Sequence, residues 1–117
     1  MTGSVSYHAG LTAEEIVERH YSRGGMPVVD RRWRGQGGEI DLVARDGAGL
    51  IFIEVKKSSS RSRAAERVTR RQMDRICAAA MEYLGATPDG QATDVRFDVA
   101  LVDAHGAVEI VENAFGV

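Results

Sequence analysis

Features that would assign this sequence to a specialised class of protein are scarce. It has a single cysteine, Cys77, so no disulfide can form within the chain. It has no cluster of cysteine and histidine residues of the kind that binds zinc. Its uninterrupted apolar runs are only a few residues long, too short for a transmembrane helix or the core of a signal peptide. The sequence therefore predicts an ordinary globular protein, which we expect in the cytoplasm.

The length and composition are those of one domain. The chain has 117 residues, of which 44% are hydrophobic and 27% are charged, as is usual for a protein with one packed core. The first ten residues show no sustained periodicity and are expected to form a flexible tail. Residues 11–117 are therefore predicted to form a single domain.

The small net charge of −2 conceals an uneven distribution along the chain. Fourteen of the 15 Lys and Arg residues lie between Arg19 and Arg75. From Ile76 onward there are seven acidic residues and one basic residue, Arg96. Such a separation along the chain allows one basic face in the folded domain.

Two segments carry the signal of a helix start. Thr12 to Glu15 and Thr69 to Gln72 both fit the capping box, in which a hydroxyl and a side-chain oxygen accept from otherwise unpaired N–H groups. The first helix should run to about Arg23, and the second to Gly85. The predicted inward residues are Ile16, Val17, His20 and Tyr21 on the first helix, and Met73, Ile76, Cys77, Ala80 and Leu84 on the second.

Five further runs have the composition of strands. They cover Met26 to Trp33, Gly38 to Ala44, Leu50 to Lys56, Val95 to Val102 and Val108 to Val111. Glycine-rich turns separate the first three strands, which is typical of hairpins. A serine- and arginine-rich run from Ser58 to Val68 predicts a mobile loop. The resulting order, α-β-β-β-α-β-β, predicts an α/β fold.

Three ionisable residues on neighbouring strands form the candidate catalytic site. Side chains alternate between the two faces of a strand, so Glu54 and Lys56 should share one face while Ile53 and Val55 point into the core. A hairpin in the simplest register brings Asp41 beside Glu54. Two adjacent carboxylates repel each other unless a proton or a cation lies between them.

A divalent cation suits this arrangement. Carboxylate and carbonyl oxygens are the ligands that Mg²⁺ or Mn²⁺ prefers, and Asp41, Glu54 and the carbonyl of Val55 supply them. Lys56 would orient a water molecule or neutralise charge on a phosphate. The alternative is a surface ion pair of Glu54 with Lys56 or Lys57, which would contribute under about 1 kcal/mol and imply no function.

These motifs resemble those of a known family. The run Gly38-Glu39-Ile40-Asp41-Leu42, followed by Ile53-Glu54-Val55-Lys56, is similar to the YraN-like family of small bacterial proteins. The basic segment around Trp33, the run Arg96 to Val99 and Asn113 to Phe115 resemble the same family, so the likeness covers the chain from Leu11 to Phe115. That family resembles archaeal Holliday junction resolvases of the PD-(D/E)xK nuclease superfamily.

The resemblance implies a fold and a set of roles. It implies a restriction-endonuclease-like mixed β-sheet flanked by helices, with Asp41 and Glu54 as metal ligands and Lys56 as the catalytic lysine. It adds Glu14 as a further catalytic carboxylate, although a carboxylate at a helix start also stabilises the helix dipole without any catalytic role. Glu39 is either an additional ligand or a structural residue, and Gln72 is a further candidate to support the ligands.

The basic residues are candidates to bind nucleic acid. They are Lys57, Arg61, Arg63, Arg67, Arg70, Arg71 and Arg75, several of them four apart on the second helix. Such a stripe can follow a phosphate backbone, or it can be a solvated helix face. No sequence-reading motif is present, so we expect selectivity for branched or flapped DNA, and a homodimer would supply two sites for two cuts.

Three functions remain open on the sequence alone. The first is a Mg²⁺- or Mn²⁺-dependent endodeoxyribonuclease that hydrolyses phosphodiesters with an activated water. The second is a catalytically silent nucleic-acid-binding module on the same fold, which would fail to bind the metal. The third is a subunit that binds an acidic protein, and steeply salt-dependent DNA binding would exclude it.

Overall fold

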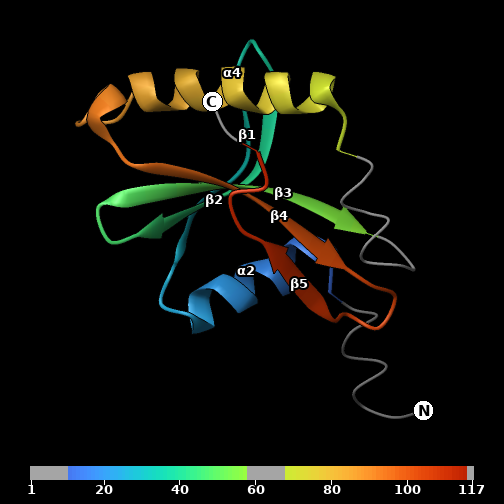
Figure 1. Ribbon diagram of the computed structural model, residues 1–117. Helices are drawn as coiled ribbons and strands as arrows, with labels where there is room; N and C mark the ends of the chain where they lie inside the picture. The colour runs from blue at the N-terminus through green and yellow to red at the C-terminus, as the bar shows by residue number, and fades with distance from the viewer. Residues whose placement is uncertain (1–10, 58–67, 116–117) are drawn as a thin grey trace.

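The computed structural model describes residues 11–57 and 68–115, which form one mixed β-sheet between two helices (Figure 1). Helix α4 covers one face of the sheet and helix α2 covers the other. The order of the elements confirms the α-β-β-β-α-β-β prediction. The predicted tail, and the predicted loop as far as residue 67, lie outside the described residues.

Helix α2 (Ala13–Arg23) begins with the predicted capping box. The Thr12 hydroxyl accepts from the Glu15 N–H at 3.1 Å, and the Glu15 carboxylate accepts from the Thr12 N–H at 3.2 Å. Val17 and Tyr21 are buried as expected, but His20 is exposed, so its assignment to the inward face was wrong. The buried stripe runs through Ala13, Val17 and Tyr21 at steps of four, and His20 lies beside it in the last turn, where an imidazole can face water.

Helix α4 (Arg70–Gly85) confirms the second predicted helix, including its capping box at Thr69 and Gln72. Its buried residues are Ile76, Ala79, Ala80 and Leu84. Cys77 is half-buried, and burial raises the pKa of its thiol. No helix among residues 11–57 and 68–115 is long and apolar enough to cross a membrane.

The sheet has the strand order β1-β2-β3-β4-β5. The strands are β1 (Val28–Arg34), β2 (Glu39–Asp46), β3 (Gly49–Lys57), β4 (Val95–Val102) and β5 (Val108–Val111). Strands β3 and β4 are parallel because α4 crosses between them, and the other neighbours are antiparallel. A short 3₁₀ turn, η1 (Gly90–Ala92), precedes β4 and was not predicted.

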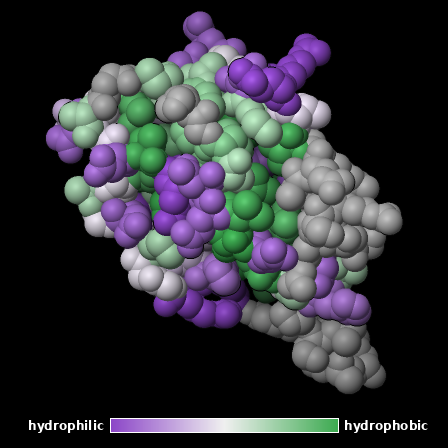
Figure 2. All heavy atoms as spheres, in the orientation of Figure 1, coloured by the Kyte–Doolittle hydropathy of each residue, from purple (hydrophilic) through white to green (hydrophobic). Residues whose placement is uncertain are grey.

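The two faces of β3 have different environments, which places the candidate site. Ile51 and Ile53 belong to the core beneath α2, whereas Phe52 belongs to the core beneath α4. By alternation, Glu54 and Lys56 lie on the α4 side and Val55 packs with the α2 core, as the sequence predicted. On the face shown in Figure 2, hydrophobic residues reach the surface between α4 and β5, where Val111 and Phe115 are only partly buried.

Asp98 is a fully buried carboxylate that fastens α2 to β4. Its oxygens accept from the Tyr21 hydroxyl at 2.7 Å, from the Arg96 guanidinium at 2.8 and 2.9 Å, and from the Asn113 N–H at 3.0 Å. The Asp98 carboxylate raises the pKa of Arg96, and burial with the same carboxylate raises the pKa of Tyr21. A charge buried this deeply is tolerated because each oxygen has partners.

Candidate active site

The site begins where the pairing between β2 and β3 stops. The last pair of this ladder is Leu42 with Ile53. The Leu50 N–H donates to the carbonyl of Asp94, so it points to the β4 side of β3. N–H groups of successive residues point to alternate sides of a strand, and Val55 is five residues beyond Leu50. The Val55 N–H therefore points toward β2. It donates to Oδ2 of Asp41 at 2.8 Å, so a side chain accepts from it where the ladder has ended.

Glu54 is the position opposite Asp41 if the register of the ladder is continued. The pKa of Glu54 is raised to about 8, first by burial and then by a hydrogen bond with the Asp41 carboxyl and by its charge. Both side chains are half-buried. Two adjacent carboxyl groups therefore share a half-buried position at the open end of the hairpin. The sequence predicted that they would be adjacent.

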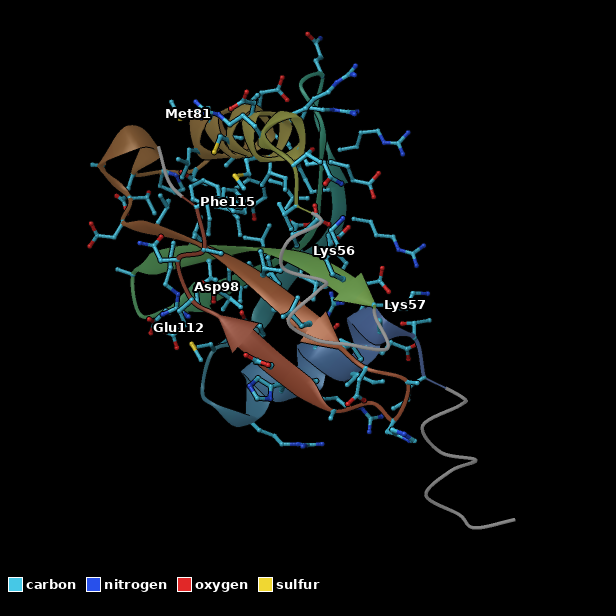
Figure 3. All side chains as sticks on the ribbon, turned by 45° about the vertical axis from the view of Figure 1, so that its right-hand side comes forward. Lys56, Lys57, Met81, Asp98, Glu112 and Phe115 are labelled. Carbon is cyan, nitrogen blue, oxygen red and sulfur yellow. The ribbon has the colours of Figure 1, made fainter. Side chains whose placement is uncertain are left out.

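Lys56 follows Glu54 on the same face of β3, at the carboxyl end of the strand (Figure 3). It is half-buried, and its charge lowers the pKa of Glu54, which opposes the effect of burial. Lys57 lies beyond it and is exposed. The structure thus brings together Asp41, Glu54 and Lys56, the three residues that carry the sequence motif.

The chemistry of these donors fits a hard divalent cation. In residues 11–57 and 68–115, no three His, Cys, Asp or Glu side chains converge on one point that could hold a metal ion. Mg²⁺ needs only one or two protein carboxylates, because water and substrate phosphate supply its other ligands. Asp41 and Glu54 supply two adjacent carboxyl groups of the kind that such an ion prefers.

The other predicted carboxylates are placed differently. Glu39 is exposed and its carboxylate pairs with Arg34 at 2.8 Å, yet its charge contributes to the raised pKa of Glu54. Glu14 lies half-buried in the first turn of α2. Among the described residues, the charges that shift the pKa of Glu54 are those of Asp41, Lys56 and Glu39, and Glu14 does not contribute. Gln72 uses its side-chain oxygen to accept from the Thr69 N–H at 3.1 Å, so that atom belongs to the cap of α4.

The predicted nucleic-acid residues are only partly described. Arg61, Arg63 and Arg67 lie outside the described residues. Lys57, Arg71 and Arg75 are exposed, and no acidic residue occupies the first turn of α4. Arg70 pairs with Asp74 at 3.3 Å, which offsets part of its charge. Within the described structure, the exposed candidates without an ion pair are therefore Lys57, Arg71 and Arg75.

Sequence reasoning missed the contacts made by Glu82. Its carboxylate accepts from the N–H groups of Gln36 and Gly37, at 2.8 and 3.1 Å, in the turn between β1 and β2. This turn leads directly into the strand that carries Asp41. The signal in the sequence was the density of glycine at Gly35, Gly37 and Gly38, which indicates a close approach by another element as well as a hairpin.

The chain is similar to known bacterial proteins over nearly its full length. Residues 13–102 match the model of a family described as "Uncharacterised protein family UPF0102". A UPF0102 protein of Cereibacter sphaeroides strain KD131 is 67% identical over 115 residues, which cover 98% of either chain. One from Ruegeria pomeroyi is 56% identical over 97% of this chain and 93% of its own. One from Dinoroseobacter shibae is 41% identical over 95% of this chain and 83% of its own. The chain therefore belongs to the UPF0102 family, the family of the YraN-like proteins that its motifs resemble.

Proposed function

We propose that this protein is a metal-dependent endonuclease of the PD-(D/E)xK type. The observation that carries the proposal is the pairing of Asp41 with Glu54 at the open end of the β2–β3 ladder, with Lys56 next on the same face. A raised carboxyl pKa beside a second carboxyl, in a half-buried position, is a common sign of a functional site. A purely structural pair would more readily combine one acid with one base.

The proposed reaction is hydrolysis of a phosphodiester by water. Asp41, Glu54 and the Val55 carbonyl would hold Mg²⁺ or Mn²⁺, which when bound acidifies water and polarises a phosphoryl oxygen. Water attacks phosphorus and loses a proton, and the bond from phosphorus to one bridging oxygen breaks. That oxygen takes up a proton, which balances the one lost by the water, so the products are a phosphate monoester and an alcohol. The Lys56 ammonium stabilises the negative charge that grows on the phosphoryl oxygens and helps to orient the attacking water.

The proposed substrate is branched or flapped DNA. This selectivity rests on the likeness to Holliday junction resolvases, and it is supported by the exposed basic side chains of Lys57, Arg71 and Arg75. Side chains of this kind bind the phosphate backbone and carry no base preference. A homodimer would offer two such sites to a branched substrate.

The test is cleavage of labelled four-way junction, flap, single-stranded and duplex DNA, with Mg²⁺ or Mn²⁺ and with EDTA. Wild-type protein should cut only with metal, and Lys56→Ala and Asp41→Asn should both abolish the cutting. Lys57→Ala is the matched control, because it removes a neighbouring charge outside the carboxylate pair and should reduce binding more than turnover. Cutting that persists in both site variants would come from a contaminant and would refute the proposal.

A silent DNA-binding module on the same fold is the second candidate. It is favoured by the absence of a third convergent ligand in the described part of the chain. Calorimetry with Mn²⁺ separates the two functions, because the enzyme must bind the metal and lose that binding in Asp41→Asn. Tight, salt-dependent DNA binding without any metal binding would select the silent module.

A further inference from the structure

Residues 33–40 form a hairpin arm that is weakly joined to the rest of the sheet. Along β1 and β2 the pairs Arg31 with Leu42 and Trp33 with Ile40 are formed, but the intervening pair of Arg32 with Asp41 is missing. Arg32 has a φ of 49°, a backbone conformation that residues other than glycine rarely adopt. The ladder to β3 ends at Leu42, so no described strand pair ties the arm to β3. The arm therefore depends on contacts outside the sheet.

Helix α4 supplies these contacts through the glycines at the tip of the arm. A Cβ added to Gly37 would lie 2.8 Å from the Cβ of Ala78, and one added to Gly38 would lie 2.8 Å from the carbonyl oxygen of Arg75. Both distances are shorter than any ordinary carbon contact. The backbone of the arm therefore rests directly on the helix, and only glycine allows this approach.

Hydrogen bonds to Glu82 stabilise this contact between the arm and α4. Its two carboxylate oxygens accept from the successive N–H groups of Gln36 and Gly37. Successive backbone N–H groups form a concave site for an anion, and hydrogen bonds to a charged acceptor are stronger than those between neutral groups. A side chain at Gly35 would collide with the same carboxylate. The turn is thus shaped around Glu82.

The base of the arm packs on Tyr83, the residue that follows Glu82 in α4. The Trp33 ring meets the Tyr83 ring edge to face with centroids 5.3 Å apart, and the Tyr83 hydroxyl donates to Asp30 at 2.9 Å. Ile40 is buried in the same core. Apolar packing fixes the base of the arm, whereas Glu82 fixes its tip.

We propose that Glu82 is a positioning residue for Asp41. Asp41 follows the arm directly and has no backbone pair with β3, so its carboxylate reaches the Val55 N–H and Glu54 only while the arm stays on α4. Releasing the tip lets the arm and the start of β2 move, and the separation of the two carboxylates changes with it. The positioning itself is independent of the proposed nuclease activity, and only its effect on metal binding rests on that function.

Amide hydrogen exchange by NMR tests the proposal without metal or substrate. In Glu82→Ala the Val55 amide should exchange about tenfold faster than in wild type, while the Ile53 amide, which belongs to the last backbone pair of the ladder, keeps its rate. Asp41→Ala gives the exchange rate of a Val55 amide that has lost its acceptor. Asp89→Asn, which removes an exposed acid beyond the end of α4, should leave both amides unchanged. Equal acceleration of Val55 and Ile53, or no acceleration of either, would overturn the proposal.

A complementary pair of substitutions tests the close approach itself. Gly37→Ala should push the tip from α4 and accelerate Val55 exchange, because the new methyl overlaps that of Ala78. Adding Ala78→Gly removes the overlap, so the double variant should recover the wild-type rate at Val55. A double variant that exchanges as fast as Gly37→Ala would refute the docking argument.

Calorimetry with Mn²⁺ on the same proteins then separates the two proposals. If Asp41 is a ligand, Glu82→Ala and Gly37→Ala should weaken Mn²⁺ binding by about tenfold, and the double variant should restore it. Wild-type protein that binds no Mn²⁺ would overturn the proposed function, while the exchange rates decide the role of Glu82. Wild-type binding that is unchanged in Glu82→Ala would overturn the link between this positioning and the metal site.

Discussion

Oδ2 of Asp41 accepts from the Val55 N–H at 2.8 Å, at the point where β2 and β3 stop pairing. One oxygen of the Asp41 carboxylate therefore replaces a backbone acceptor at the end of the β2–β3 ladder. The same carboxyl group also forms a hydrogen bond with Glu54. The Asp41 side chain thus has both a structural contact and a proposed role in metal binding, so substitutions are needed that affect these two roles differently.

Asp41→Asn and Asp41→Ala make that separation. The asparagine keeps a carbonyl oxygen for the Val55 N–H, so its stability should stay near that of wild type. Alanine leaves the half-buried N–H without an acceptor, which costs about 1 to 3 kcal/mol. Both should lower Mn²⁺ affinity by about a hundredfold or more, because the charged ligand is lost. Urea unfolding and calorimetry check the two effects, and equal stability of the two variants would contradict the structural role.

The raised pKa of Glu54 makes stability depend on pH. In the unfolded chain this carboxyl has its ordinary pKa of 4.5, and in the folded protein the pKa is about 8. The folded state thus binds the proton more tightly. The stability contributed by the protonated form is fully present below pH 4.5 and is lost as the pH rises through about 8.

Glu54→Gln should remove this dependence. Glutamine has the shape of the protonated acid and cannot ionise, so the variant should match wild type near pH 5 and exceed its melting temperature near pH 9, in buffer with EDTA. Asp89→Asn serves as the control, because it replaces an exposed carboxylate outside the Asp41–Glu54 pair by an amide. A constant difference between Glu54→Gln and wild type from pH 5 to 9 would show that Glu54 ionises normally.

Much of the fold could be predicted because local signals agree with the tertiary structure. The hydroxyls of Thr12 and Thr69 start both helices, and β4 and β5 have the predicted bounds. The Asp41 and Glu54 pairing followed from strand alternation and hairpin register. These features depend on residues near each other in sequence or on one hairpin.

The contacts of Glu82 and Asp98 could not be predicted in the same way. Glu82 lies 46 residues from Gln36, and Asp98 lies 77 residues from Tyr21. A polar residue within an apolar strand, or on the outer part of a helix, does not reveal which distant group it meets. An aspartate in the hydrophobic run of β4 does indicate that a buried partner exists, since an unpaired charge would not be stable there.

Tyr21→Phe tests the buried Asp98 network. The substitution keeps the ring and removes one of the donors to Asp98, so it should lower the free energy of unfolding by about 1 to 3 kcal/mol. Mn²⁺ affinity should stay unchanged, because the Tyr21 hydroxyl is bonded to a carboxylate other than Asp41 and Glu54. Urea unfolding and calorimetry measure the two quantities, and a loss of metal affinity at unchanged stability would connect this network with the site.

The arginines in the first turn of α4 give a prediction for DNA binding. Arg71 is exposed and no acidic residue lies in the first turn of α4, so Arg71→Ala should weaken junction binding and reduce the dependence of log Kd on log salt by about 1. Arg70→Ala should have a smaller effect, because Asp74 already offsets the charge of Arg70. Asp74→Asn frees that charge and should tighten binding. Fluorescence anisotropy over a salt series measures all three, and equal slopes would show that DNA does not lie along this helix.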